Sequence, residues 1–150
     1  MTRIQVLAPL DGVVVELEKV PDQVFAQKMV GDGVAIDPSG SIAVAPVAGK
    51  LLKLFPGGHA FGISTPSGAE LIVHIGLDTI ELKGKGFKNI ATEGQQVQPG
   101  TPIVSFDRPI IEQLGKVILS PVVSSGGGRI VERATGTVRA GKDVLFVLEI

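Results

Sequence analysis

Residues 59–74 read HAFGISTPSGAELIVH and predict a β-hairpin that carries both histidines of the chain. Two apolar runs flank the segment Thr65-Pro66-Ser67-Gly68, and proline at the second turn position with glycine at the fourth is typical of a type I turn. If Thr65 and Gly68 close the turn without a bulge, Ser64 lies opposite Ala69 and His59 lies opposite His74. Opposed residues have Cβ atoms about 4.5–5.5 Å apart, so we expect the two imidazole rings to touch.

Alternation along the second strand separates a core face from a functional face. The core face is predicted to hold Leu71, Val73, Ile75 and Leu77. The other face is predicted to hold Ile72, His74, Gly76 and Asp78. We expect Gly76 to leave room for a tetrahedral group beside the His74 ring and Asp78 to place a carboxylate nearby. This face is the candidate site.

Two adjacent imidazoles favour nucleophilic chemistry at phosphorus. Like charges and an apolar environment both disfavour ionisation, so at least one ring should be neutral near pH 7. A neutral imidazole nitrogen can attack phosphorus while its neighbour donates a hydrogen bond to the arriving group. Other interpretations remain open on these residues alone, because strand histidines are often purely structural. A zinc hydrolase usually supplies three protein ligands, and two histidines are too few.

The rest of the chain predicts an all-β fold, an antiparallel β-sandwich or barrel with only short helical turns. Twenty glycines and ten prolines punctuate short apolar runs, a pattern of strands and tight turns. The remaining predicted strands are Ile4–Ala8, Gly12–Leu17, Gly33–Asp37, Ser41–Val44, Gly49–Leu54, Pro102–Phe106, Val117–Leu119, Gly136–Arg139 and Val144–Ile150, and the hairpin strands extend over His59–Thr65 and Glu70–Leu77. Short helical turns are predicted over 22–27 and 107–114, each after an aspartate cap.

Two weak internal repeats suggest that the β architecture is duplicated. Residues 8–12, APLDG, recur as APVAG at 45–49, with a fainter echo in SPV at 120–122. Separately, the spacing of valine, glycine and an aliphatic residue at 97, 100 and 103 recurs at 138, 141 and 144. Chance recurrence in a protein rich in glycine and proline remains the alternative.

Composition narrows the class of protein further. A length of 150 residues predicts one domain, residues 1–150. The formal net charge of −1 and the scattered basic residues argue against nucleic-acid binding. The sequence has no apolar run long enough for a membrane span and no signal-peptide pattern at its start. The absence of cysteine excludes disulfides and thiolate chemistry. We therefore expect a soluble cytoplasmic protein.

Residues 68–80, GAELIVHIGLDTI, and 81–87, ELKGKGF, resemble a specific family signature. They are similar to the segment around the phosphorylated histidine in glucose-class enzyme IIA domains of the bacterial phosphoenolpyruvate-dependent sugar phosphotransferase system. Further similarities lie at 20–25, 30–36, 45–49, 58–61 and 93–97, so the resemblance covers nearly the whole chain.

The resemblance implies a duplicated hybrid-type β-sandwich in which His74 carries a phosphoryl group on Nε2 with His59 as its partner. The donor would be the phosphocarrier HPr, and the acceptor a cysteine of the IIB domain of a sugar permease. Partners would dock on an apolar depression whose candidate residues are Val24, Phe25, Val30, Phe55 and Ile80. Asp22, Gly76 and Asp78 are candidate supporting residues. No cofactor is required, although in relatives the two histidines can share zinc with a carboxylate of a regulatory partner.

The sequence departs from the family pattern in two places, and each departure leads to an expectation. The family often has threonine two residues before the first histidine, whereas this chain has Gly57-Gly58. A hydroxyl contact is therefore lost or replaced by backbone N–H groups. The amphipathic N-terminal extension of enteric members is also missing, so we expect no membrane tethering through it.

Two alternative functions use similar β architecture. A biotinyl- or lipoyl-type carrier needs a lysine at a hairpin tip, and Lys28-Met29 lacks the local motif. A zinc peptidase needs more ligands than the two histidines provide. The sequence therefore predicts neither a covalent cofactor nor hydrolase activity.

Overall fold

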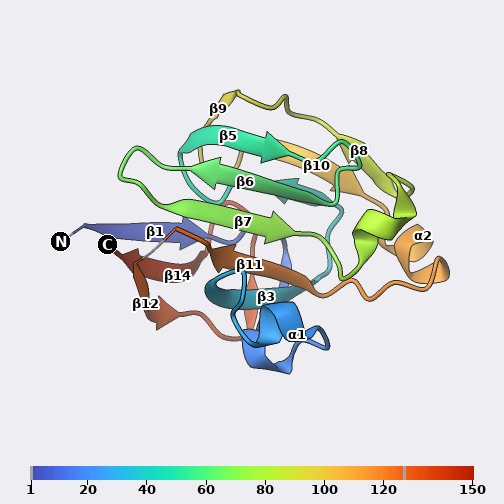
Figure 1. Cartoon of the computed structure of the whole chain (residues 1–150), viewed down its shortest axis with the longest axis horizontal. Coiled ribbons are helices and arrows are strands. Elements are labelled where there is room, and N and C mark those ends of the chain that lie inside the picture. Colours follow the sequence, from blue (N-terminus) through green and yellow to red (C-terminus); the bar gives the residue numbers. More distant parts are fainter. Residues whose placement is uncertain (1, 127) are drawn as a thin grey trace.

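The computed structural model describes residues 2–126 and 128–150 (Figure 1). Its strands are β1 (Arg3–Leu7), β2 (Gly12–Glu16), β3 (Asp32–Pro38), β4 (Ile42–Val44), β5 (Gly49–Leu54), β6 (Ala60–Ser64), β7 (Glu70–His74), β8 (Phe87–Asn89), β9 (Gln96–Val97), β10 (Pro102–Phe106), β11 (Ser120–Ser124), β12 (Arg129–Arg133), β13 (Thr137–Val138) and β14 (Val144–Glu149). Its helical segments are the α-helices α1 (Gln23–Ala26) and α2 (Arg108–Gln113) and the 3₁₀ turns η1 (Leu17–Lys19) and η2 (Thr79–Leu82).

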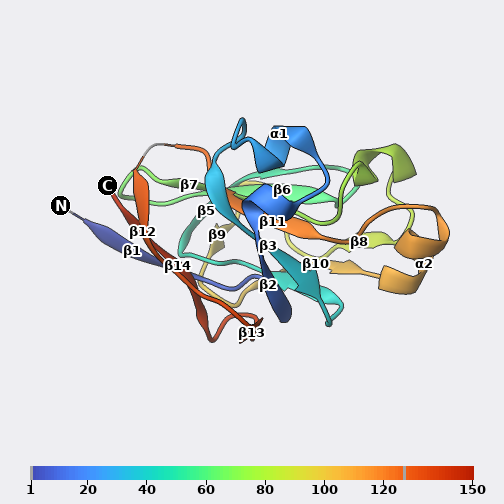
Figure 2. The same ribbon diagram turned by 90° about the horizontal axis from the view of Figure 1, so that it is seen from below.

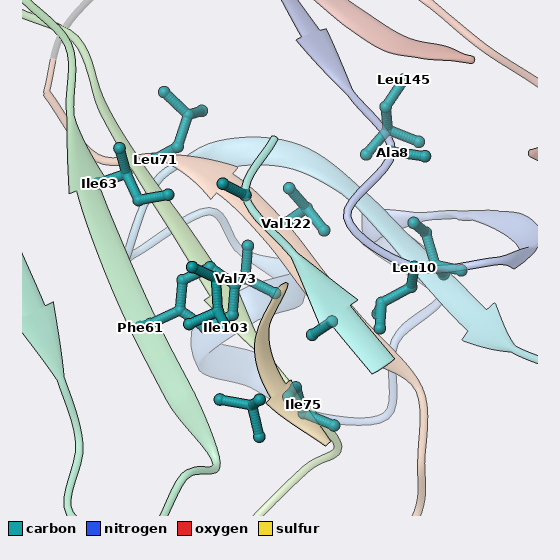
Figure 3. Packing of buried hydrophobic residues seen from close by; sticks show 14 of the residues in the cluster. Ala8, Leu10, Phe61, Ile63, Leu71, Val73, Ile75, Ile103, Val122 and Leu145 are labelled. Carbon is teal, nitrogen blue, oxygen red and sulfur yellow. The ribbon is translucent and has the colours of Figure 1, made fainter. Parts of the chain in front are cut away.

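The strands form one large antiparallel sheet and two small ones. The large sheet has eight strands in the order β13-β2-β3-β11-β7-β6-β5-β9, and the small sheets have the orders β1-β14-β12 and β4-β10-β8. The main core lies between them and joins Phe61 and Val73 of the large sheet to Ile103 and Leu145 of the small ones (Figure 3). This arrangement confirms the predicted antiparallel β-sandwich.

The internal repeats correspond to two structurally matching halves. Gly12 opens β2 and pairs with Val138 of β13, while Gly49 opens β5 and pairs with Val97 of β9. The two small sheets also match, with the orders β1-β14-β12 and β4-β10-β8. In this comparison β1 corresponds to β4, β14 to β10 and β12 to β8. The duplicated architecture predicted from the repeats is therefore confirmed.

The hairpin that carries the histidines forms, but its register differs by one residue from the prediction. Ala60, not His59, pairs with His74, and Ser64 pairs with Glu70. Gly68 N–H donates a hydrogen bond to the Thr65 carbonyl, as in a type I turn over these residues. However, Gly68 has a φ of +94°, so it adds a bulge residue after the type I turn. That extra residue shifts every pair of the hairpin.

Other strand predictions are mostly confirmed, with shifted ends. The prediction of a strand at Val117–Leu119 is wrong, because the strand there begins only at Ser120. The strands β8, β9, β11 and β12 were not predicted. Both predicted helical turns form, with Asp22 and Asp107 as side-chain caps. No helix in the described parts of the chain combines the length and apolar character that crossing a membrane requires.

A second apolar cluster covers the outer face of the large sheet. It joins Leu17 and Phe25 to Leu77 and Val123, and α1 lies on this side while the small sheets lie on the other (Figure 2). Leu77 is buried as predicted, but it belongs to this outer cluster, because regular strand structure ends at His74. The outer cluster places Phe25 beside the histidines.

Candidate functional site

Four rings from three parts of the chain line the candidate site. The centroids of the His59 and His74 rings are 5.4 Å apart in an edge-to-face arrangement. Phe25 of α1 lies 5.3 Å from the His74 ring, and Phe55 lies 4.9 Å from the His59 ring. The ring contact expected between the two histidines is therefore present despite the shifted register.

The contact survives the shift because His59 stands outside the regular strand. His59 precedes β6 at a bend, and its carbonyl accepts a 2.7 Å hydrogen bond from Ile75 N–H. A regular strand residue opposite Ile75 would point into the core. The bend frees the His59 ring to lie against His74, the last residue of β7.

The His74 ring is fixed by the residue two positions after it. His74 Nδ1 lies 2.6 Å from the Gly76 carbonyl oxygen. A carbonyl only accepts, so Nδ1 carries the proton and the neutral ring keeps a lone pair on Nε2. Gly76 has a φ of +77°, and a Cβ there would lie 2.6 Å from Thr79 Cγ2. The missing side chain thus accommodates Thr79, not a tetrahedral group as the sequence suggested.

Both histidines favour the neutral form. Burial and the neighbouring His74 lower the pKa of His59 to about 4. Burial also lowers the pKa of His74, although its hydrogen bond to Gly76 and the charges of Asp22 and Asp78 oppose that shift. The two carboxylates therefore act on His74 through charge, and near pH 7 Nε2 is available as a nucleophile.

A hollow of about 350 Å³ adjoins the His74 ring. Three of the predicted docking residues, Phe25, Val30 and Phe55, line it together with His74. Val24 and Ile80 do not line it and are exposed at 46% and 60%. The structure therefore brings part of the predicted apolar set into one depression and leaves two members outside it.

Comparison with known proteins identifies the family. Residues 4–128 match the family described as phosphoenolpyruvate-dependent sugar phosphotransferase system, EIIA 1. The chain belongs to this family. A glucose-specific EIIA component of Buchnera aphidicola is 43% identical over 97% of this chain and 88% of its own length. An N-acetylglucosamine-specific EIICBA component of Escherichia coli is 42% identical over 97% of this chain, which spans 23% of that protein.

A solved structure agrees with the family assignment. The glucose permease IIA of Mycoplasma capricolum superposes with a TM-score of 0.91 at 39% identity, covering 98% of this chain and 96% of that one. The comparisons support a phosphocarrier of the sugar phosphotransferase system and neither alternative function. Lys28, considered for a swinging-arm carrier, instead lies within 4 Å of Glu18 and Asp32 carboxylates.

Sequence reasoning missed several residues of this EIIA site. Leu52 and Ile72 also line the hollow. Leu52 is the extra residue of a β-bulge, because the pairing of β5 with β6 shifts between Leu51 and Lys53. Its 49% exposure follows from that bulge, which no local sequence signal revealed. Ile72 was placed on the correct face but was not included among the docking residues.

Gly57 and Gly58 directly precede His59, and Gly57 stands where the family often has threonine. A Cβ at Gly57 would lie 3.5 Å from His59 Nδ1, so a side chain at this position would face the ring. The Gly58 N–H donates to the Phe55 carbonyl at 2.8 Å. Gly58 therefore does not supply the backbone donor that was expected to replace a hydroxyl.

The two histidines are the candidate metal ligands that the described part of the chain brings together at the EIIA site. Within residues 2–126 and 128–150, no group of three or more His, Cys, Asp or Glu side chains is placed to hold a metal ion. Two imidazoles supply half of a tetrahedral zinc shell. The described residues thus do not form a complete zinc site by themselves.

The low pKa of His59 predicts that acid destabilises this EIIA fold. The unfolded chain protonates His59 near its ordinary pKa of 6.5, whereas the folded chain does so only near 4. Between these values the unfolded state binds more protons than the folded state. Lowering the pH through this range therefore lowers the free energy of unfolding, by up to about 3 kcal/mol. Urea unfolding measured from neutral pH to about pH 4.5 should show a smaller loss for His59→Gln. Equal losses in both proteins would contradict this.

Proposed function

We propose that residues 1–150 form one phosphocarrier domain that accepts a phosphoryl group from phospho-HPr on Nε2 of His74. The domain then passes the group to a cysteine of its IIB domain. One observation carries the proposal: the 2.6 Å hydrogen bond that His74 Nδ1–H donates to the Gly76 carbonyl. That bond leaves the Nε2 lone pair free for attack on phosphorus.

The proposed transfer needs no proton to leave the ring. The Nε2 lone pair forms a bond to phosphorus as the bond between phosphorus and the donor nitrogen breaks, and that nitrogen keeps the electron pair. The proton stays on Nδ1 throughout, hydrogen-bonded to the Gly76 carbonyl. In the second step the cysteine thiolate attacks phosphorus, and the Nε2–P bond breaks with its electron pair returning to Nε2. Neutral histidine is the reactive form, which agrees with the lowered pKa of His74.

His59 is proposed to hydrogen-bond the phosphoryl group on His74. The contact between the rings supports this role, since their centroids are 5.4 Å apart. A donor fixed next to the site of transfer stabilises charge that develops on the phosphoryl oxygens. Because Phe55 also packs against the His59 ring, the ring needs little reorganisation during transfer.

HPr and the IIB domain are proposed to dock on the hollow lined by Phe25, Val30 and Phe55. A small apolar depression suits transient contact with more than one partner. The Escherichia coli relative is an EIICBA component, and this name joins B and A parts in one protein, which supports IIB as acceptor. We place this activity in the cytoplasm, with no membrane insertion and no nucleic-acid partner.

Zinc is proposed only as an ion shared with a regulatory partner. His59 and His74 would provide two nitrogen ligands, and a carboxylate of the partner would add to them. No step of the phosphoryl transfer depends on this ion.

Phosphorylation in a reconstituted system tests the proposed function. The protein is incubated with phosphoenolpyruvate, enzyme I and HPr, and its intact mass is measured. We expect one added phosphoryl group, and none when HPr is omitted. Absence of the adduct with an active enzyme I and HPr would refute the proposal. A mass increase of a biotinyl or lipoyl group before incubation would favour the swinging-arm alternative instead.

A further inference from the structure

A buried serine from a distant strand holds the glycine that orients His74. Ser120 is the first residue of β11 and is 0% exposed. Its Oγ accepts a 3.1 Å hydrogen bond from Gly76 N–H and donates a 2.7 Å hydrogen bond to the Ile118 carbonyl. The Gly76 carbonyl in turn accepts the hydrogen bond from His74 Nδ1. Ser120 is thus linked to His74, the proposed nucleophile, through one residue, Gly76.

We propose that Ser120 is a positioning residue that, through Gly76, keeps His74 in the tautomer whose Nε2 can receive a phosphoryl group. The inference rests on the proposed function for the meaning of that tautomer, although the tautomer itself exists without any partner. Ser120 touches neither the His74 ring nor an incoming group in this arrangement. The hydroxyl of Ser120 acts by determining which nitrogen of the His74 ring carries the proton.

The directions of the hydrogen bonds make Ser120 suited to this role. A hydroxyl has one proton, and the Ser120 proton goes to the Ile118 carbonyl, so a lone pair faces Gly76 N–H. Removing the hydroxyl would leave this buried N–H without a partner, and such a group is costly. Gly76 would then shift toward another partner, and this would weaken the hydrogen bond between its carbonyl and the Nδ1 proton of His74.

Two further hydrogen bonds hold the peptide units on either side of Gly76. Thr79 Oγ1 donates to the Ile75 carbonyl at 2.7 Å. Leu77 N–H donates to the Val117 carbonyl at 2.8 Å. These bonds should keep the turn in place when Ser120 is replaced. A loss of the Ser120 hydroxyl is therefore expected to change the tautomer of His74 more than the fold.

The tautomer can be read directly by ¹⁵N NMR of the imidazole nitrogens in the unphosphorylated protein. Only two histidines contribute signals, and the His59→Gln variant assigns those of His74. The parent should show protonated Nδ1 and unprotonated Nε2. Ser120→Ala should show a mixture of the two tautomers, and Ser120→Thr, which keeps a hydroxyl, should resemble the parent. Ser105→Ala, in β10 of a small sheet, is the matched control and should not change the signals.

Phosphorylation kinetics supply the second measurement. Loss of one neutral hydrogen bond predicts that Ser120→Ala accepts the phosphoryl group from phospho-HPr about tenfold more slowly, with Ser120→Thr near the parent rate. Parent-like tautomer signals in Ser120→Ala would overturn the proposal. A parent His74 protonated on Nε2 would also overturn it, and that result needs no variant to fold. If the tautomer shifts as expected but the parent accepts no phosphoryl group, the positioning role stands and the proposed function fails.

Discussion

Replacing His74 by glutamine is expected to abolish phosphorylation of the chain by phospho-HPr. Glutamine keeps a polar side chain of similar length but has no lone pair on nitrogen that can attack phosphorus. The adduct on the parent protein should be acid-labile and should form on this domain without ATP or added magnesium. Intact mass and acid treatment of the phosphorylated protein measure both properties.

The control for this result is a fold-matched variant that keeps His74. Ser105→Ala should accept the phosphoryl group at the parent rate, and unfolding curves should show that His74→Gln is folded. Undiminished phosphorylation of folded His74→Gln would contradict the assignment. It would direct attention to His59, the other histidine of the chain.

Replacing His59 by glutamine is expected to impair delivery of the phosphoryl group more than its acceptance. The variant should still be phosphorylated on His74, because the Gly76 carbonyl continues to hold the Nδ1 proton. Onward transfer to the IIB domain should slow by a factor of about 10²–10³, the effect of removing one well-placed donor to a developing charge. Single-turnover transfer from purified phosphorylated variant to the IIB domain measures this step separately.

A second variant distinguishes a hydrogen-bonding role for His59 from a packing role. Phe55→Leu removes the ring that packs on His59 but keeps the imidazole, so it should slow transfer much less than His59→Gln. Parent-like onward transfer in His59→Gln would rule out the proposed role. Equal losses in the two variants would show that the shape of the hollow, not the donor, matters.

Local sequence signals predicted the parts of the fold that depend on neighbouring residues. The aspartate caps, the Pro-Gly turn and the repeated glycine turns all involve residues within a few positions of one another. The hairpin register was not fixed by such signals. Proline and glycine at positions 66 and 68 suit both a type I turn and the same turn followed by a bulge. Only pairing along the whole hairpin decides between them.

The site was predictable where it lay within one hairpin and unpredictable where distant segments meet. The sequence brought His59 and His74 together, but it could not show that Gly76 bonds to Ser120 or that Phe25 packs on His74. These contacts join segments far apart in the chain, and no alternation or spacing encodes them. The apolar run Val117–Leu119 was wrongly predicted to be a strand for the same reason. Its Val117 carbonyl accepts a hydrogen bond from Leu77 N–H in the turn after β7.

The two matching halves differ in the order in which a growing chain can complete them. The half with the histidines pairs β5 with β9, so all of that pairing lies within the first two-thirds of the sequence. The other half pairs β2 with β13, which joins the beginning of the chain to its end. Synthesis proceeds from the N-terminus, and a long loop must close before such a distant pair forms. The strands that pair around both histidines are therefore all synthesised before the strand that closes the other half.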